Sequence, residues 1–425
     1  MNLRKEERYC VDHSKTEEII EELSHFMSEQ RNLTDYNQTL YFNNLEHEVP
    51  FNLSIKARKY INNTTDRMIE FQKNDKWIFE IKEDIIIANS RMRQKYRKET
   101  TFNEILSEMK TNERLLNLPF TIPFHPYLSD SYRRRHFVTS DKKGLRITVD
   151  SQLKYYMFKD LLTAEQIGNE NYDRIEIKIP QNKIGSLEVE KVKAILNDPS
   201  IEMIVSKKDM AYNILASYRR RQANRNVPSS NTEIEAKLSL DDKDQYVFHR
   251  IKNDIRNRNI TGFRLIGNFD YTLEGAKIHS YLIAPDEDYL RVSTKGKTKT
   301  VIKKSNTEIA TDKFGLNCIV KRNENRYPFT EDMKKFPSRI LHRKRKYFLV
   351  ESELTGNSFC ILVDRSICNT NDIFQMEIEG LAFSPSSRDE EQIVKDISYL
   401  TNQIVERYDV LKPTAQTKLE WLKTL

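Results

Sequence analysis

Polar and apolar residues alternate strictly in a short stretch just past the middle of the chain, Thr232 to Leu238. Alternation with a period of two predicts a β-strand that is buried on one side. The polar side of this strand carries Glu233, Glu235 and Lys237. A strand facing solvent would show the same pattern, so this stretch alone leaves open whether the charges lie on the surface or in an interior.

A second stretch, Phe374 to Gly380, repeats the pattern and places Glu377 and Glu379 on one side. The strands expected between the two stretches are rich in Arg and Lys. Crowded carboxylates are costly unless positive charge neutralises them, and a divalent metal bound to a phosphate chain supplies both signs of charge. The two stretches together therefore favour a charged barrel interior over surface decoration.

The N-terminal half contains further strands that are polar on one side and apolar on the other. Each of their charged residues alone would be interpreted as a solvated surface group. Together, several such strands predict a closed antiparallel barrel with a charged lumen. The candidate phosphate-binding residues of this half are Arg4, Glu6, Arg8, Lys56, Arg58, Glu80, Lys82, Lys95, Arg97, Arg134, Arg146, Glu176 and Lys178.

Helical patterns and loop signals divide the chain. The pattern is helical from Leu187 to about Arg225, and Asn226 to Asn231 has the composition of a domain boundary. A last helix is expected to begin with a capping box at Ser387 and Glu390. We therefore predict an α+β protein with two tandem antiparallel β-barrel domains and flanking helices. The predicted limits are 1–185 for the first domain, 186–231 for a helical connection and linker, and 232–425 for the second.

Composition narrows the class of protein. The chain has 425 residues, of which 38% are hydrophobic and 31% charged, and no stretch is long and apolar enough for a membrane span. The charged N-terminus does not resemble a secretory signal, so we expect a cytoplasmic protein without membrane insertion. The four cysteines have neither CxxC pairing nor metal-ligand spacing. Only 10 glycines are present, and phosphate-cradling Gly-rich loops are absent, so any phosphate must be held by side chains.

The net charge of +7 is modest, since 70 basic residues are offset by 63 acidic ones. This excess suits a polyanionic ligand. A protein that coats nucleic acid would usually show a stronger bias or a basic tail.

The second half resembles the CYTH family of triphosphate tunnel proteins, whose first strand carries an ExExK motif like that of Glu233, Glu235 and Lys237. The stretch Tyr289 to Val292 resembles the strand that supplies a phosphate-binding Arg in that family. The basic stretch His342 to Tyr347 and the closing strand with Glu377 and Glu379 also fit the resemblance.

The first half is similar to the vacuolar transporter chaperone (VTC) domain, a triphosphate tunnel fold that in fungi polymerises polyphosphate from ATP. The resemblance covers most of residues 1–180. It depends on eight segments in the same order: RKEERY, TLYFNN, SIKARKYI, FEIKED, KYRKE, SYRRRHF, GLRITVD and RIEIK. Arg8 stands where that family has Lys, and Asn43 where it usually has Asp.

The resemblance implies a metal-dependent phosphoryl-transfer enzyme that acts on triphosphate, polyphosphate or nucleoside triphosphate. The four glutamates Glu233, Glu235, Glu377 and Glu379 would hold Mg²⁺ or Mn²⁺, for which carboxylate oxygens are suitable ligands. The phosphate oxygens would be held by Lys237, Arg291, Lys303, Arg343 and Arg345. The reaction would be hydrolysis of the chain, or polyphosphate synthesis by the N-terminal half.

Three alternatives stay open at this point. Fungal and viral mRNA-capping enzymes share the tunnel and the paired ExE strands, so the substrate could be triphosphate-ended RNA. A module that binds polyphosphate or nucleotides without cleaving them would need the same cations. A third hypothesis makes the N-terminal half a polyphosphate polymerase and the C-terminal half an enzyme that trims its product.

Overall fold

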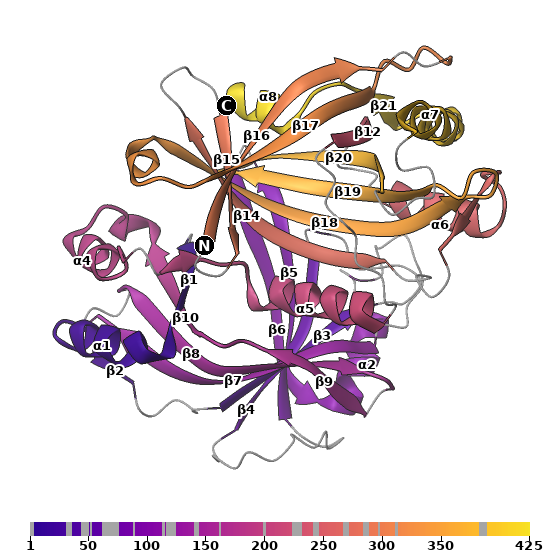
Figure 1. Ribbon diagram of the computed structural model, residues 1–425. Helices are drawn as coiled ribbons and strands as arrows, with labels where there is room; N and C mark the ends of the chain where they lie inside the picture. The colour runs from indigo at the N-terminus through magenta and orange to yellow at the C-terminus, as the bar shows by residue number, and fades with distance from the viewer. Residues whose placement is uncertain are drawn as a thin grey trace. The chain divides into compact units, whose positions relative to one another are not determined.

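The computed structural model divides the chain into two compact units, unit 1 (Met1–Tyr218) and unit 2 (Arg219–Leu425) (Figure 1). It describes residues 4–30, 36–43, 51, 53–61, 76–87, 90–112, 115, 125–139, 144–160, 163–198, 201–222, 232–240, 246–266, 272–283, 289–295, 298–310, 313–381 and 389–425. The boundary predicted at Asn226 to Asn231 lies outside these residues. In the described part of the chain, no helix combines the length and apolar character that crossing a membrane requires.

Unit 1 is built on an 11-stranded antiparallel sheet. Its strands are β1 (Arg4–Val11), β2 (Ser28–Glu29), β3 (Tyr36–Asn43), β4 (Leu53–Ile61), β5 (Lys76–Ile87), β6 (Ser90–Thr101), β7 (His125–Val138), β8 (Arg146–Phe158), β9 (Ala164–Asn169), β10 (Asp173–Pro180) and β11 (Glu202–Met203). The order along the sheet is β11-β1-β10-β8-β7-β3-β4-β5-β6, with β2 paired to β7 and β9 to β8. Among the described residues, no ladder joins β6 back to β1.

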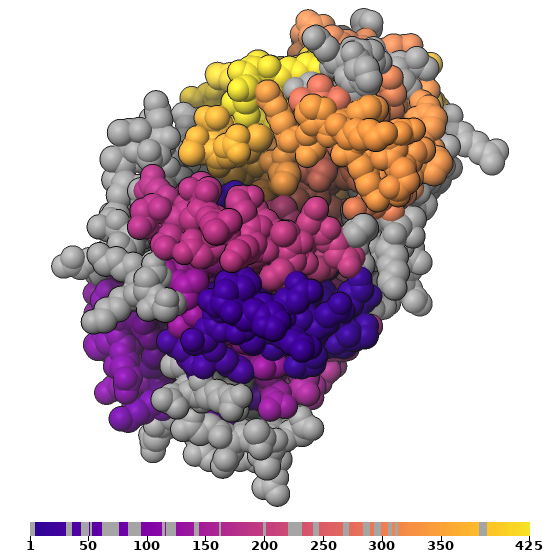
Figure 2. Space-filling model, turned by 90° about the vertical axis from the view of Figure 1, so that its left-hand side faces the viewer, coloured from indigo at the N-terminus to yellow at the C-terminus, as the bar shows by residue number. Residues whose placement is uncertain are grey.

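Helices pack on both faces of this sheet. They are α1 (His13–Ser24), α2 (Phe102–Thr111), α4 (Leu187–Ile195) and α5 (Lys207–Gln222). The apolar residues Ile19, Ile20 and Leu23 of α1 pack with Val189 and Val192 of α4 in one core cluster. Figure 2 shows the indigo atoms of the α1 region beside the magenta atoms of the α4 region on one face of unit 1. Because α4 and the first part of α5 pack in unit 1, much of the segment predicted as a connection belongs to this unit.

The strands of unit 1 separate apolar from charged side chains. On β4, Ile55 and Ala57 are buried in the cluster that includes α2, and the alternation of the strand places Lys56 and Arg58 on the other face. Residues of α5, among them Tyr212, pack in a third cluster with Tyr41 and Tyr132 from that other face. The second face is therefore polar, and α5 covers part of it.

Unit 2 is built on a 10-stranded antiparallel sheet. Its strands are β12 (Thr232–Leu240), β13 (Phe263–Leu265), β14 (Leu273–Ile283), β15 (Tyr289–Lys295), β16 (Thr298–Ile309), β17 (Ile319–Pro328), β18 (Ser338–Ser352), β19 (Ser358–Cys368), β20 (Asn371–Gly380) and β21 (Leu411–Pro413). The ladder runs β18-β14-β15-β16-β17-β12-β20-β19, and β19 pairs again with β18. This last pairing closes eight strands into a barrel, which leaves no free edge among them.

The helices of unit 2 are α6 (Val247–Arg256), α7 (Glu390–Arg407) and α8 (Lys418–Lys423). The expected apolar stripe of α7 is confirmed, since Ile393, Ile397, Leu400 and Ile404 are buried. The expected capping box is not the cap of this helix. Instead, the Asp389 side chain accepts a hydrogen bond from the backbone N–H of Gln392, and Ser387 lies outside the described residues. A carboxylate at this position satisfies the same free donor as a serine hydroxyl.

The predicted fold class is confirmed as α+β with antiparallel sheets and flanking helices. The closed barrel is described in full for unit 2, and unit 1 shows a large antiparallel sheet with one polar face.

Candidate functional site

A cavity of about 630 Å³ lies inside the barrel of unit 2. Side chains from seven of the eight barrel strands and from α8 line it. Eleven of the lining residues are lysines or arginines and six are glutamates, so the walls carry an excess of five positive charges. A cavity of this composition suits a compact polyanion, because the surrounding protein focuses the positive field inside it.

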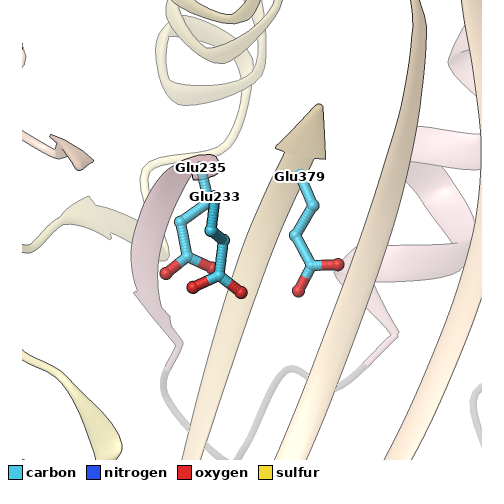
Figure 3. Close-up of side chains that lie close together, drawn as sticks. All are labelled: Glu233, Glu235 and Glu379. Carbon is cyan, nitrogen blue, oxygen red and sulfur yellow. The ribbon is translucent and has the colours of Figure 1, made fainter. Parts of the chain in front are cut away.

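Three glutamates form a cluster on one wall of this cavity. Figure 3 shows the side chains of Glu233 and Glu235 on β12 and that of Glu379 on β20, and one carboxylate oxygen of each lies within 4.8 Å of the others. Strand pairing brings these carboxylates together, because Glu235 pairs with Glu379 in the register of β12 and β20. A set of three carboxylates matches the hard oxygen ligands that Mg²⁺ and Mn²⁺ prefer.

Two cations hold the β12 carboxylates in place. Arg322 donates to both Glu233, at 2.7 Å, and Glu235, and Lys304 Nζ lies 2.5 Å from Glu233. Burial acts to raise the pKa of Glu233, but Lys304 and Arg322 outweigh it and hold that pKa below its usual range. The Glu233 carboxylate is thus kept ionised, as metal ligation requires.

The negative charge of Glu379 is less well balanced by nearby cations than the charges of the neighbouring glutamates. Arg345 Nη1 lies 3.4 Å from its carboxylate. Burial and the nearby carboxylates Glu377, Glu235 and Glu233 raise the pKa of Glu379 to about 7, against the opposing effect of Arg345. Excess negative charge at this point is what a bound divalent cation would relieve, so the residues present fit a metal ion.

The fourth predicted metal ligand, Glu377, lies outside this cluster. Its carboxylate is held by Lys237 at 2.8 Å, Lys418 at 2.6 Å and Arg345 at 3.3 Å. Against the effect of burial, these three cations keep its pKa well below the usual range. Lys237, which is 1% exposed, bridges Glu377 and Glu235, so in the structure it contacts carboxylates.

The predicted cations Arg291, Lys303, Arg343 and Arg345 all line the cavity. Arg345 is firmly anchored, since its Nε and Nη2 each lie 2.8 Å from an oxygen of the buried Asp364. Arg343 is held loosely, with Nη1 3.9 Å from Asp364 and a buried Nε that has no hydrogen-bond partner in the described structure. Burial and the neighbouring Arg345 lower the pKa of Arg343, although a guanidinium remains charged at any ordinary pH. Arg343 is therefore more available to an anionic ligand than Arg345.

In unit 1, strand register places the described candidate residues on the polar face of the sheet. Arg8 pairs with Glu176, and Lys56 pairs with Glu80, which pairs in turn with Arg97. By the same alternation, Glu6, Arg58, Lys82, Lys95, Arg134, Arg146 and Lys178 share this face. Arg4 has the same parity, but its side chain lies outside the described set.

Carboxylates organise the cations of this polar face. Glu80 lies 2.8 Å from Lys95 and 3.5 Å from both Lys56 and Lys82. Burial lowers the pKa of Lys56 well below its usual range, and Arg58 and Lys82 act in the same direction. The Glu80 carboxylate thus contacts three lysines, and an added anion would reduce the repulsion among them.

Several residues of the unit 2 cavity were not predicted from the sequence. Arg322, Lys304 and Glu324 lie on β17 and β16 and line the cavity, and the alternation of Arg322 with Glu324 is a signal that could have identified two of them. Lys418 on α8 reaches Asp364 at 2.8 Å, and no local pattern indicates that a helix so far along the chain would reach into the barrel. His279 on β14 also lines the cavity.

Comparison with known proteins gives structural likenesses only. No protein-family model matches the chain. No curated protein sequence matches it either. One similar solved structure is a Bacillus halodurans protein named as a candidate adenylate cyclase, with 13% identity and a TM-score of 0.27 over 45% of this chain and 98% of that one. Another is the RNA triphosphatase domain of a mimivirus mRNA capping enzyme, with 15% identity and a TM-score of 0.27 over 47% of this chain and 98% of that one. A third is the S. pombe Pct1 RNA triphosphatase in complex with the Spt5 CTD, with 11% identity and a TM-score of 0.26 over 50% of this chain and 96% of that one.

Proposed function

We propose that unit 2 is a metal-dependent hydrolase that removes the terminal phosphate from a triphosphate chain. The observation that carries this proposal is the joint presence, inside one closed barrel, of an excess of cations and the cluster of Glu233, Glu235 and Glu379. Phosphoryl transfer needs mainly positioning and electrostatic stabilisation, and this cavity offers side chains for both.

The cations would bind and orient the chain. Arg343 and Arg345 extend from β18, and Arg291 extends from β15, so guanidinium groups from two strands can contact phosphate oxygens in the cavity. Arg345 is fixed by Asp364, and this contact sets its direction before the substrate arrives. Such preorganised charge stabilises the transition state because little reorganisation is needed during the reaction.

The three-glutamate cluster would hold Mg²⁺ or Mn²⁺, with Arg322 and Lys304 keeping Glu233 and Glu235 in position. A divalent ion there would neutralise phosphate charge and polarise the terminal phosphoryl group. In the reaction, a water oxygen forms a bond to the terminal phosphorus and the bond from this phosphorus to its bridging oxygen breaks. The products are phosphate, a chain shorter by one phosphate, and a proton.

For unit 1 we propose binding of a phosphate chain on the polar face. The supporting observation is the set of Lys56, Lys82 and Lys95 around the single carboxylate of Glu80. Within the residues that the structure describes, the three-carboxylate cluster of unit 2 has no counterpart in unit 1. This difference favours binding over hydrolysis in unit 1.

One assay separates the substrate classes. The full chain is incubated with inorganic triphosphate, ATP or triphosphate-ended RNA under Mg²⁺ or Mn²⁺, and both phosphate release and chain growth are measured. We expect phosphate release that stops when EDTA removes the metal.

Activity restricted to triphosphate-ended RNA would identify an RNA 5′-triphosphatase. Polyphosphate growth from ATP would assign synthesis to unit 1. Tight binding of all three without turnover would contradict the hydrolase and leave a binding module.

A further inference from the structure

His279 is a buried polar residue whose ring has no partner. It lies on β14, is 6% exposed and lines the unit 2 cavity. Both of its ring nitrogens are buried, and in the described part of the chain neither has a hydrogen-bond partner. Buried polar atoms are almost always paired in folded proteins, so two orphaned nitrogens on one ring at a cavity wall indicate a site for a ligand.

Two arginines that act electrostatically on His279, Arg291 and Arg343, also have a buried nitrogen without a hydrogen-bond partner in the described structure. Arg291 donates to Glu324 at 3.0 Å through Nη2, but its buried Nε has no partner in the described structure, and the same holds for Nε of Arg343. All three side chains line one cavity. The unmet groups of the arginines are donors, and the unprotonated oxygens of a phosphate chain are acceptors. A phosphate chain is therefore a ligand that could accept hydrogen bonds from these unpaired donors.

The charged and titratable groups around His279 disfavour its protonated form. Lys277 and Tyr281 flank it on β14, and Arg291, Arg343 and Asp364 face it from β15, β18 and β19. Burial lowers the pKa of His279 well below its usual range, and Arg343, Arg291 and Lys277 add to the effect, whereas Asp364 opposes it. A neutral imidazole has one donor and one acceptor nitrogen, so a phosphate chain would satisfy only one of them.

We propose that His279 binds the phosphate chain directly, takes up one proton as the chain enters, and then donates hydrogen bonds from both ring nitrogens to phosphate oxygens. The proton comes from solvent and adds to the acceptor nitrogen. The chain makes this favourable because its negative charges cancel the repulsion from Lys277, Arg291 and Arg343. The inference deepens the proposed function of unit 2 and depends on it for the identity of the ligand.

Calorimetric titration of the full chain with inorganic triphosphate, in EDTA so that turnover cannot occur, tests the proposal. The titration is repeated near neutral pH in buffers of different ionisation enthalpy, which gives the number of protons taken up. The variants are His279→Phe, which removes both nitrogens, and His279→Gln, which keeps one donor. His342→Gln is the matched control, because His342 lies exposed on the neighbouring strand β18. Thermal unfolding checks that each variant is folded.

We expect His279→Phe to weaken binding about tenfold, as loss of hydrogen bonds to a charged ligand does, and His279→Gln to weaken it less. Both variants should take up fewer protons than the wild type, by up to about one per bound chain, and His342→Gln should behave as the wild type. Any change in the protonation of triphosphate itself is common to all variants and cancels in the comparison.

The outcomes separate the two proposals. Wild-type binding that both His279 variants leave unchanged in affinity and proton uptake overturns the role of His279 and leaves the hydrolase standing. Proton uptake that depends on His279, without phosphate release under Mn²⁺, supports His279 and overturns the hydrolase. A wild-type protein that does not bind triphosphate overturns both.

Discussion

Replacement of Glu379 by glutamine is expected to reduce metal-dependent phosphate release by about a thousandfold, the loss typical of removing one group that stabilises charge in the transition state. The substitution keeps the shape of the side chain and removes the charge that completes the cluster with Glu233 and Glu235. Glu235→Gln should have a similar effect on the rate. Steady-state phosphate release at saturating Mn²⁺ measures both.

Folding and catalysis respond differently to this substitution. Because Glu379 is crowded by Glu377, Glu235 and Glu233, its neutralisation should leave the thermal unfolding midpoint unchanged or higher. The matched control is Glu331→Gln, since the Glu331 side chain is 85% exposed and does not line the cavity. Wild-type activity in Glu379→Gln would contradict the metal assignment, as would an equal loss in Glu331→Gln.

Arg343→Met and Arg345→Met are expected to lose activity to a similar extent but to differ in stability. Each removes a cation from the cavity wall, and a loss of about a hundredfold to a thousandfold in kcat/KM is the usual result at phosphate-transfer sites. Arg345 makes two 2.8 Å contacts with Asp364, which is fully buried. Its removal leaves a buried carboxylate without its main partner and should destabilise unit 2 by about 3 to 5 kcal/mol.

Arg343 lacks such an anchor. Its Nη1 is 3.9 Å from Asp364 and its Nε has no partner among the described residues, so Arg343→Met should change the free energy of unfolding by less than about 1 kcal/mol. Chemical unfolding followed by fluorescence, with phosphate release measured on the same samples, compares the two. A fully active Arg343→Met protein, or an Arg345→Met protein as stable as the wild type, would show that these roles are assigned wrongly.

Local pattern was sufficient to predict the two carboxylate strands and their common face. Glu235 and Glu379 have the same parity in their own strands, and the antiparallel ladder then pairs them directly. The apolar stripe of α7 was predicted from helical spacing for the same reason, since both periodicities are properties of a single segment.

Packing between distant elements determines which cations contact each carboxylate, and the local sequence pattern does not contain this information. Glu377 has the same parity as Glu379, but Lys418 from α8 and Lys237 take up its carboxylate, and the docking of α8 has no signature in the strand that it reaches. On β16, Lys303 was selected from the sequence and lines the cavity, and its neighbour Lys304, which was not selected, makes the contact with Glu233.

The role of the helical segment predicted as a connection also depends on tertiary packing. Its helical pattern was recognised, but whether a helix connects two domains or completes one depends on what its apolar side contacts. Val189 and Val192 of α4 pack against the β-sheet core of unit 1, and Ala211 and Leu215 of α5 pack with Tyr132 and Tyr155. The sequence shows the apolar side and not its partner.

The most direct test of the proposed hydrolase is phosphate release from inorganic triphosphate by the full chain in ¹⁸O-labelled water, with Mn²⁺ and with Glu379→Gln beside the wild type. Attack of water on the terminal phosphorus predicts released phosphate that carries one ¹⁸O, unlabelled diphosphate, and a rate that falls to background in the variant. Absence of phosphate release above that background in the wild type would contradict it.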